Sequence, residues 1–243
     1  MERHNFKPGT LHAPLPAVMA TVGDMENSNI ITVAWTGILS SDPARTYISV
    51  RPSRHTHKIL MEKGEFVINL TTEGLAFATD FSGIYTGAKV DKFEKLGLTK
   101  LQSKCVFAPT IKESPLALEC RVFDVLHMGT HDVFMADIVN VSCDPSLLDE
   151  KGRICFEKAG LIAYAHGEYF AIGEKVGTFG FSAAKTEKAK RYAERSKRIL
   201  NAKKGAKAEG NGEKKKNVDF KPKSQKRRTG APVSKENGGK TSK

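Results

Sequence analysis

One segment constrains the fold of this chain more than any other: two β-type runs that lead into a basic turn and a helix. Residues 30–35 and 46–50 are rich in β-branched and apolar residues, which favour strands. Pro52 cannot donate a hydrogen bond to a sheet, so we expect the second strand to stop there. A short helix is predicted over 56–63, and Gly64 suits the position just after its end.

The turn between the second strand and the helix predicts a site for an anion, such as the phosphate of a nucleotide-like cofactor. It brings Arg51, Ser53, Arg54 and Thr56 to the start of the predicted helix. Guanidinium groups form bidentate hydrogen bonds with phosphate oxygens. The free N–H groups and the dipole of a helix N-terminus also favour an anion. The alternative for the two arginines is a solvated surface turn.

The remaining sequence up to residue 182 alternates short β-rich runs with turn signals and shows little helical periodicity. Further strands are predicted at 17–23, 66–70, 116–126 and 132–141, and short helices at 73–80 and around 90–97. About six strands with few helices predict a mainly β fold, a closed barrel rather than a doubly wound parallel sheet. The absence of a G-x-G-x-x-G motif after the first strand agrees with this interpretation, and the sequence also lacks a P-loop and an H-E-x-x-H motif.

The charge of the chain is divided unevenly between two parts. Residues 1–182 contain 18 Lys+Arg and 21 Asp+Glu. The whole chain contains 39 Lys+Arg and 27 Asp+Glu, so residues 183–243 contain the other 21 Lys+Arg and 6 Asp+Glu. We therefore predict a mildly acidic globular domain at 1–182 and a basic tail at 183–243. Residues 186–200 permit a charged helix, whereas from Lys203 onward apolar residues are too few to bury, which predicts disorder.

Several features predict a cytoplasmic protein without a membrane span. There is no run of about 18 apolar residues, and the first residues contain no apolar core of a secretory signal. The four cysteines are widely spaced and form no C-x-x-C pair, so we expect reduced thiols and no iron–sulfur cluster; they are Cys105, Cys120, Cys143 and Cys155.

Polar residues elsewhere give weaker signals. His55 and His57 flank Thr56, but they diverge at a helix start and have no third ligand nearby, so we expect surface imidazoles and no metal site. His127 and His131 bracket a turn and are expected to be loop residues. Asn69 lies inside an apolar strand, where its amide needs hydrogen-bond partners. Those partners are either structural groups or a cofactor.

Five motifs occur in a fixed order: NIITVAWTG at 29–37, SVRPSRHTHK at 49–58, FVINL at 66–70, TDFSG at 79–83 and DKFEKLGLT at 91–99. A later stretch, GEYFAIGEKVGTFG, lies at 167–180. Together these motifs resemble the flavoredoxin and flavin reductase-like family of FMN-binding split barrels, over roughly residues 10–182. The resemblance implies a Greek-key split β-barrel with a few short helices. It also implies a homodimer with one FMN bound non-covalently per subunit, near the dimer interface.

The resemblance also implies where the cofactor lies. The isoalloxazine ring would lie against Ala34, Trp35 and Thr36 and the following loop to Ser40, whose backbone amides would hydrogen-bond to it. Trp35 alone is equally consistent with a residue that fills the core or an interface. For the phosphate, the implied contacts are Ser49, Arg51, Arg54 and Thr56, with Lys92 as a second cationic contact. A solvated charged helix is the alternative for Lys92.

The function implied by the resemblance is that of an FMN-dependent oxidoreductase, either a flavin reductase or a flavoredoxin-like electron carrier. Electrons would come from NAD(P)H or from a ferredoxin-type protein. Hydride transfer to a flavin requires no acid–base residue, so we predict no catalytic side chain.

The alternative function is that of a nucleic-acid-associated protein with the barrel as a scaffold. The basic runs of the tail, 214–216 and 226–228 among them, would neutralise phosphates without sequence specificity. Tyr192 and Phe220 are the tail's only aromatic residues, so base stacking has little support. We favour the alternative that the tail is an appendage that is solubilising or weakly attracted to membranes or RNA.

Overall fold

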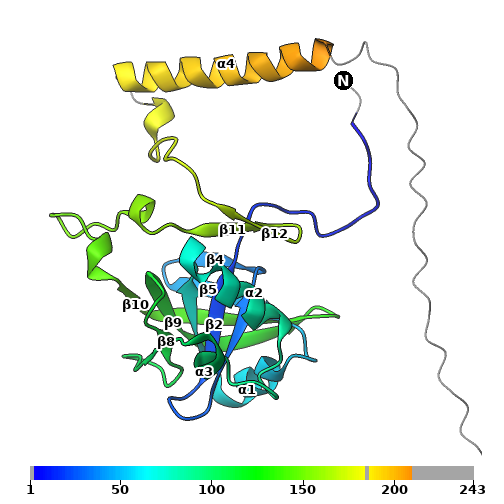
Figure 1. Cartoon of the computed structure of the whole chain (residues 1–243), viewed down its shortest axis with the longest axis vertical. Coiled ribbons are helices and arrows are strands. Elements are labelled where there is room, and N and C mark those ends of the chain that lie inside the picture. The colour runs from blue at the N-terminus through cyan, green and yellow to red at the C-terminus, as the bar shows by residue number, and fades with distance from the viewer. Residues whose placement is uncertain (1–2, 184–185, 210–243) are drawn as a thin grey trace, which may run out of the picture. The chain divides into compact units, whose positions relative to one another are not determined.

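A seven-stranded antiparallel sheet, in the order β3–β2–β6–β9–β10–β5–β4, dominates the computed structural model, which describes residues 3–183 and 186–209 (Figure 1). Its strands are β2 (Val18–Gly23), β3 (Ser28–Val33), β4 (Thr36–Ser41), β5 (Ala44–Val50), β6 (Glu65–Leu70), β9 (Leu116–His127) and β10 (Asp132–Cys143). Although β3 lies at one edge of the sheet, it also contacts β5 near the other edge, so the sheet curls back on itself.

Two small sheets and a set of short helices complete the fold. One sheet joins β1 (Leu15–Pro16), β11 (Ile162–Ala165) and β12 (Glu168–Ala171), and the other joins β7 (Lys100–Leu101) and β8 (Thr110–Ile111). The α-helices are α1 (His55–Lys63), α2 (Ala76–Ile84), α3 (Lys92–Leu96) and α4 (Glu187–Glu209). The 3-10 turns are η1 (Glu73–Leu75), η2 (Pro145–Leu147), η3 (Phe156–Lys158) and η4 (Phe181–Ala183). A mainly β fold with few short helices is therefore confirmed.

Helix ends follow the signals in the sequence. Gly64 follows α1 with φ of 65°, in the left-handed region that glycine adopts without strain. At α3, the Asp91 carboxylate accepts hydrogen bonds from the N–H groups of Phe93 and Glu94, which caps the helix start. Gly97 ends that helix with φ of 64°. These caps fix where α1 ends and where α3 begins and ends.

The predicted strands are confirmed to within a few residues, but one segment predicted as a loop is wrong. Residues Thr36–Ser41 form strand β4, which pairs with β5 through a tight turn at Asp42 and Pro43. The apolar residues Ile38 and Leu39 and the close return of the chain favour pairing over an open loop. The shortest strands, β1, β7 and β8, have two residues each, too few to leave a periodic signal in the sequence.

Apolar residues from six strands and one helix fill the interior of the barrel. Phe66, Phe134, Val22, Ile48 and Leu60 have at most 1% of their surface exposed. Burying each such side chain stabilises the fold by about 1.5–3 kcal/mol. The barrel wall around this core is the rigid support on which the loops and short helices are mounted.

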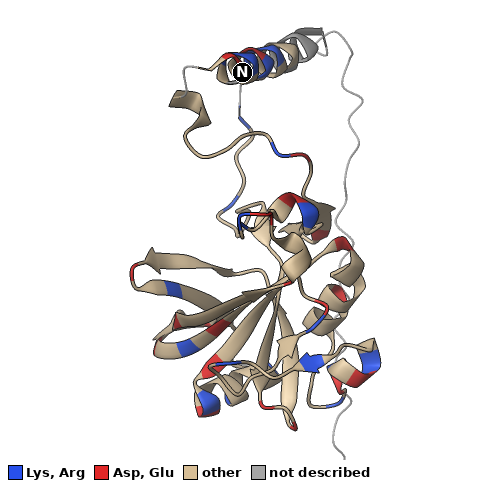
Figure 2. Ribbon diagram, turned by 90° about the vertical axis from the view of Figure 1, so that its left-hand side faces the viewer, with Lys and Arg blue, Asp and Glu red and all other residues tan. Residues whose placement is uncertain are grey.

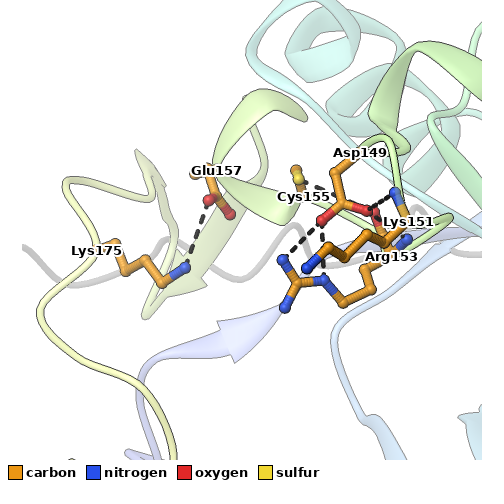
Figure 3. Close-up of polar contacts among 6 residues, drawn as sticks. All are labelled: Asp149, Lys151, Arg153, Cys155, Glu157 and Lys175. Atoms are coloured by element: carbon orange, nitrogen blue, oxygen red, sulfur yellow. Dashed lines mark hydrogen bonds and ion pairs between the residues drawn. The ribbon is translucent and has the colours of Figure 1, made fainter.

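A network of polar contacts orders the segment that joins β10 to β11 (Figure 3). The Asp149 carboxylate accepts hydrogen bonds from the backbone N–H groups of Lys151 and Arg153 and pairs with the Arg153 guanidinium at 2.8 Å. These bonds, led by those from Arg153, hold the pKa of Asp149 below its usual range. Farther along, Lys175 pairs with Glu157 at 3.4 Å. These polar contacts therefore hold the segment together internally.

The chain divides into two compact units by its internal contacts, residues 1–176 and 177–243. The sequence placed this boundary after residue 182. Helix α4, which extends the charged helix predicted at 186–200, belongs to the second unit. The disorder predicted for the tail falls mainly on residues 210–243, which lie outside the described residues. Of the helices that the structure describes, none combines the length and apolar character needed to cross a membrane.

Asn69 is a structural residue, which resolves one of the two alternatives left open by the sequence. Its amide N–H group donates to the carbonyl oxygens of Met19 and Val67, and its Oδ1 atom accepts from the N–H of Ile111 at 2.9 Å. The side chain is fully buried. It therefore joins β6 to β2 and to the end of β8.

We predict that Asn69→Ala lowers the free energy of unfolding by about 1–3 kcal/mol, because the buried Ile111 N–H loses its partner. Urea denaturation measures this change. The matched control, Lys112→Ala on the surface, should stay within about 0.5 kcal/mol of the unaltered protein. Equal stabilities for the two variants would contradict a structural role for Asn69.

Candidate functional site

Two adjoining cavities lie in the first unit. The larger has a volume of about 440 Å³ and is lined by, among others, Ala34, Trp35, Ser49, Asp80, His131 and Tyr169. The smaller has a volume of about 280 Å³ and is lined by, among others, Asn29, Ser53, Thr56, Ser82, Thr86 and Lys92. Ile31, Arg51 and Arg54 line both. Because three residues are shared, an elongated molecule can occupy both cavities at once.

The smaller cavity is built around the N-terminus of α1. Arg54 occupies the N-cap position without a side-chain capping bond, so the first N–H groups of the helix have no cap. Thr56 in the first turn is buried, and its Oγ1 atom accepts a hydrogen bond from Asn29 Nδ2 at 2.7 Å. The hydroxyl proton of Thr56 therefore remains available as a donor. These groups and the two arginines form a pocket of donors and positive charge suited to an anion.

Lys92 adds a buried cation to the same cavity. Its Nζ atom donates to the carbonyl oxygens of Ile30 and Ser82, at 2.5 and 2.8 Å, and the side chain is 4% exposed. An ammonium group has three N–H donors, so one remains after these two bonds. Burial, together with the positive charge of Arg54, lowers the pKa of Lys92 to about 8. An anion in the cavity would favour the charged form of Lys92.

Two further features of the smaller cavity indicate that it is shaped for a polar ligand. The Ser82 hydroxyl is buried and has no hydrogen-bond partner among the described residues, which is costly unless a ligand or water satisfies it. Gly87 also lines the cavity, and a Cβ atom at this position would overlap the side-chain amide of Asn29. Glycine at 87 thus leaves Asn29 in place to hold Thr56.

Aromatic rings and a carboxylate form the wall of the larger cavity. Trp35 packs on His131 with 4.4 Å between ring centroids, and burial together with Arg51 lowers the pKa of His131. The Tyr169 hydroxyl donates to Asp80 at 3.3 Å, and burial and that carboxylate raise the pKa of Tyr169 to about 12. Tyr169 is therefore neutral at physiological pH. These groups give the larger cavity flat apolar surfaces with a polar margin.

Most of the residues predicted for the site come together. Those that line one or both cavities are Ala34, Trp35, Ser49, Arg51, Arg54, Thr56 and Lys92. Thr36 and Ser40 line neither of the two. Thr36 is buried, and its hydroxyl donates to the Tyr47 carbonyl. Both lie in β4, where pairing with β5 replaces the predicted loop.

The prediction that His57 is a surface imidazole is wrong. The side chain is 14% exposed, and its Nε2 atom lies 2.6 Å from Asp132 Oδ2. His127 contacts the other carboxylate oxygen of Asp132 at 2.8 Å, and the hydrogen bonds from His127 and His57 lower the pKa of Asp132. Asp132 begins β10, so its contact with His57 connects α1 to the β9–β10 hairpin. The sequence around His57 could not predict this contact, because Asp132 lies far along the chain.

Sequence reasoning missed several residues that line the cavities, although the motifs contained some of them. Asn29 begins the first motif, and Asp80 and Ser82 lie within the TDFSG motif. Tyr169 lies in the late GEYF stretch, which the β11–β12 hairpin brings to the larger cavity. His131 was missed because the sequence placed it only beside a turn. Asn29 could have been found as a polar residue at the start of an apolar motif.

The family model described as the flavin reductase-like domain matches residues 11–173. This chain belongs to the flavin reductase-like family. The match covers both cavities, the curled sheet and the β11–β12 hairpin, so the split-barrel class predicted from the sequence is confirmed.

Solved structures of flavin reductase-like proteins share the fold. Flavoredoxin of Desulfovibrio vulgaris is 28% identical, with a TM-score of 0.71 over 75% of this chain and 100% of that one. An FMN-binding protein from Thermus thermophilus with bound 1-cyclohex-2-enone is 27% identical, with a TM-score of 0.62 over 73% and 98% of the two chains.

By sequence, an uncharacterized protein of Archaeoglobus fulgidus is 36% identical over 136 residues, which are 56% of this chain and 77% of the relative.

We predict that Gly87→Ala lowers the free energy of unfolding by about 1–3 kcal/mol, because the added methyl group displaces the buried Asn29 amide. Thermal unfolding followed by circular dichroism measures the change. In the matched control, Gly173→Ala, the methyl group meets open space, so little change is expected. A Gly87→Ala variant as stable as this control would show that Asn29 moves without cost.

Proposed function

We propose that this chain is an FMN-dependent oxidoreductase that passes electrons from NAD(P)H or a protein carrier, through bound FMN, to an acceptor. The observation that carries the proposal is the pair of adjoining cavities that share Arg51 and Arg54. One cavity offers donors for an anion, and the other offers flat aromatic walls. This is the division that a phosphate joined to a ring system requires.

The donors of the smaller cavity fit a phosphate group. Arg51 and Arg54 supply charge-assisted hydrogen bonds, and Thr56 and the uncapped start of α1 supply neutral donors. The buried Ser82 hydroxyl would gain the partner that it lacks among the described residues. Lys92 lies deeper and would act through its charge and its remaining N–H group.

The larger cavity fits an isoalloxazine ring. Trp35 and His131 would border the ring on one side, and Tyr169 and Asp80 would border the opening of the cavity. Ala34 joins β3 to β4, and the Trp35 carbonyl accepts from the Ser49 N–H at 2.9 Å, which fixes this segment against β5. The Thermus thermophilus relative, named as an FMN-binding protein, supports FMN as the flavin.

In such a complex FMN supplies the redox chemistry, accepting a hydride or single electrons and passing them on. The residues of this chain bind the phosphate, orient the ring and limit the access of water. None of them must transfer a proton for hydride to reach a flavin, so the proposal assigns no catalytic acid or base.

The proposal includes a homodimer. Strand β4 is an edge of the large sheet, and its exposed side chains include Ile38 at 67% and Leu39 at 47%. Trp35, beside the larger cavity, is 37% exposed. Contiguous exposed apolar residues at an edge strand favour association with another chain. Light scattering after gel filtration would give twice the chain mass; a monomer at all concentrations would exclude this part of the proposal.

The first experiment asks whether purified protein carries or takes up flavin. The expected result is a flavin absorbance band that loses intensity when NADH, NADPH or reduced ferredoxin is added without oxygen. The rates at which the three donors bleach the band rank them as electron donors to this protein. A colourless protein that fails to take up added FMN would overturn the proposal, whereas a bound flavin that no donor reduces would exclude only the electron path.

We predict that Arg54→Ala weakens FMN binding by about tenfold to a hundredfold, because a charge-assisted hydrogen bond contributes about 1.5–3 kcal/mol. Quenching of flavin fluorescence measures the Kd. The control, Arg3→Ala, removes an exposed arginine remote in sequence from both cavities and should leave the Kd unchanged. An unchanged Kd in Arg54→Ala would remove this arginine from the phosphate site.

We predict that FMN affinity falls as the pH rises through about 8, where Lys92 loses its proton in the flavin-free protein. The bound phosphate favours the ammonium form of Lys92, so FMN binding raises the pKa of this residue. Each unit by which the pKa rises corresponds to on the order of tenfold in FMN affinity. Kd values measured from pH 7 to 10 test this. Lys92→Met should flatten the profile; an equal slope in this variant would assign the titration to another group.

The stability of the flavin-free protein should change in the opposite direction. The pKa of Lys92 is about 8 in the folded protein, below the 10.5 of an unperturbed lysine. Between these values the unfolded chain binds more protons than the folded protein, so the contribution of Lys92 to stability rises with pH.

A further inference from the structure

A buried carboxylate, that of Asp132, lies beside the candidate site without lining either cavity. Charged residues occupy a minority of the strand positions, which are mostly tan in Figure 2, and the Asp132 side chain is 8% exposed. Burying a carboxylate is costly, and apolar groups in place of a buried ion pair often give a fold at least as stable. A buried carboxylate at the start of β10 therefore indicates a role besides stability.

Both carboxylate oxygens of Asp132 are bonded by imidazoles from other elements. Oδ2 lies 2.6 Å from His57 Nε2 on α1, and Oδ1 lies 2.8 Å from His127 Nδ1 at the end of β9. A carboxylate only accepts, so each imidazole donates the N–H that faces it. The His57 ring also packs edge-on against the buried Phe134, at 5.3 Å between centroids. Asp132 and Phe134 alternate on β10 and together hold the His57 ring against that strand.

His57 belongs to the turn that carries the donors of the smaller cavity. Its backbone N–H donates to the Arg54 carbonyl at 3.0 Å, and the Arg54 N–H donates to the Arg51 carbonyl at 2.9 Å. Thr56, whose hydroxyl lies at the smaller cavity, directly precedes His57. The turn is therefore anchored to β3 through Thr56 and to β10 through His57.

Strand β10 also leads to a wall of the larger cavity. His131 directly precedes Asp132, lines the larger cavity and packs on Trp35 at 4.4 Å between ring centroids. In the sheet, Asp132 pairs with Val50 of β5, next to Arg51. This pairing is made by backbone groups, so it does not require a carboxylate at position 132. What the carboxylate adds is a link from the start of α1 to the strand end beside the ring wall.

We propose that Asp132 is a positioning residue for the phosphate of a bound flavin. Through His57 it holds the start of α1, with the donors Arg54 and Thr56, in a fixed relation to the ring wall at His131. Asp132 contacts no cofactor atom in this role, because it acts through the imidazole. The inference rests on the proposed function, since it takes the anion of the smaller cavity to be a flavin phosphate.

Three effects of removing this carboxylate can be told apart. Loss of a negative charge would by itself tighten the binding of an anion. A general loss of stability would weaken FMN and riboflavin alike. Misplacement of the helix start would weaken FMN and spare riboflavin, which has no phosphate. The sign and the selectivity of the change in Asp132→Ala therefore identify its cause.

The experiment measures the Kd values of FMN and riboflavin for the full chain, by quenching of flavin fluorescence. We expect Asp132→Ala to bind FMN about tenfold more weakly, and riboflavin within about twofold of the unaltered protein. Asp132→Asn makes the same change in charge but keeps hydrogen-bonding groups for the imidazoles, so it should regain most of the FMN affinity. The matched control is Asp137→Ala on the same strand, whose carboxylate pairs with Arg45 at 2.8 Å and lines neither cavity. It should leave both Kd values unchanged.

A second pair of variants makes the same test if circular dichroism shows that Asp132→Ala does not fold. His57→Leu removes the donor to Asp132, whereas His57→Gln keeps an amide N–H on a side chain of similar reach. We expect the leucine variant to bind FMN about tenfold more weakly and the glutamine variant to lose less than about threefold.

The other outcomes separate this inference from the proposed function. Equal losses for FMN and riboflavin in Asp132→Ala, or an FMN Kd equal to that of Asp137→Ala, would overturn the positioning role alone. Tighter FMN binding would replace it with an electrostatic role. A loss in His57→Gln as large as in His57→Leu would exclude action through this imidazole. An unaltered protein that binds neither flavin would overturn the proposed function, and this inference with it.

Discussion

The hydrogen bond from Asn29 to Thr56 is the contact on which the rest of the candidate site depends. It joins the start of β3 to the first turn of α1, so that the helix N-terminus faces the smaller cavity. Gly87 leaves the space that this amide needs. With the helix start fixed, Arg51 and Arg54 lie where both cavities meet. A small shift of this bond would separate the donors that an anion needs together.

Some buried polar groups stabilise the fold, whereas others are available to bind a ligand. The two kinds differ in how many hydrogen-bond partners the protein itself provides. Asn69 is satisfied by backbone groups and serves the fold. Lys92 is held by two carbonyl oxygens and keeps one donor in reserve, while Ser82 has no partner among the described residues. An unsatisfied buried group is costly, so the Ser82 hydroxyl, with the spare donor of Lys92 in the same cavity, favours a ligand there.

The sequence predicted six strands of the large sheet, α1 with its terminal glycine, and seven of the residues that line the candidate site, since alternation, caps and arginines at a helix start are local signals. It could not predict contacts made by distant segments. Strand β4 depends on pairing with β5, and His57 is buried because Asp132, far along the chain, meets it. Tyr169 and Asp80 meet only when the β11–β12 hairpin reaches α2. Contacts between distant segments leave neither a periodic pattern nor a fixed residue spacing in the sequence.

The measurement that tests the central claim most directly compares the Kd values of FMN and riboflavin, which differ only by the phosphate. If the phosphate occupies the smaller cavity, the unaltered protein binds FMN about a hundredfold more tightly than riboflavin, from two charge-assisted contacts. In the Arg51→Ala/Arg54→Ala variant this preference should shrink to a few-fold while riboflavin affinity stays nearly the same. Equal affinities for the two flavins in the unaltered protein would contradict the account.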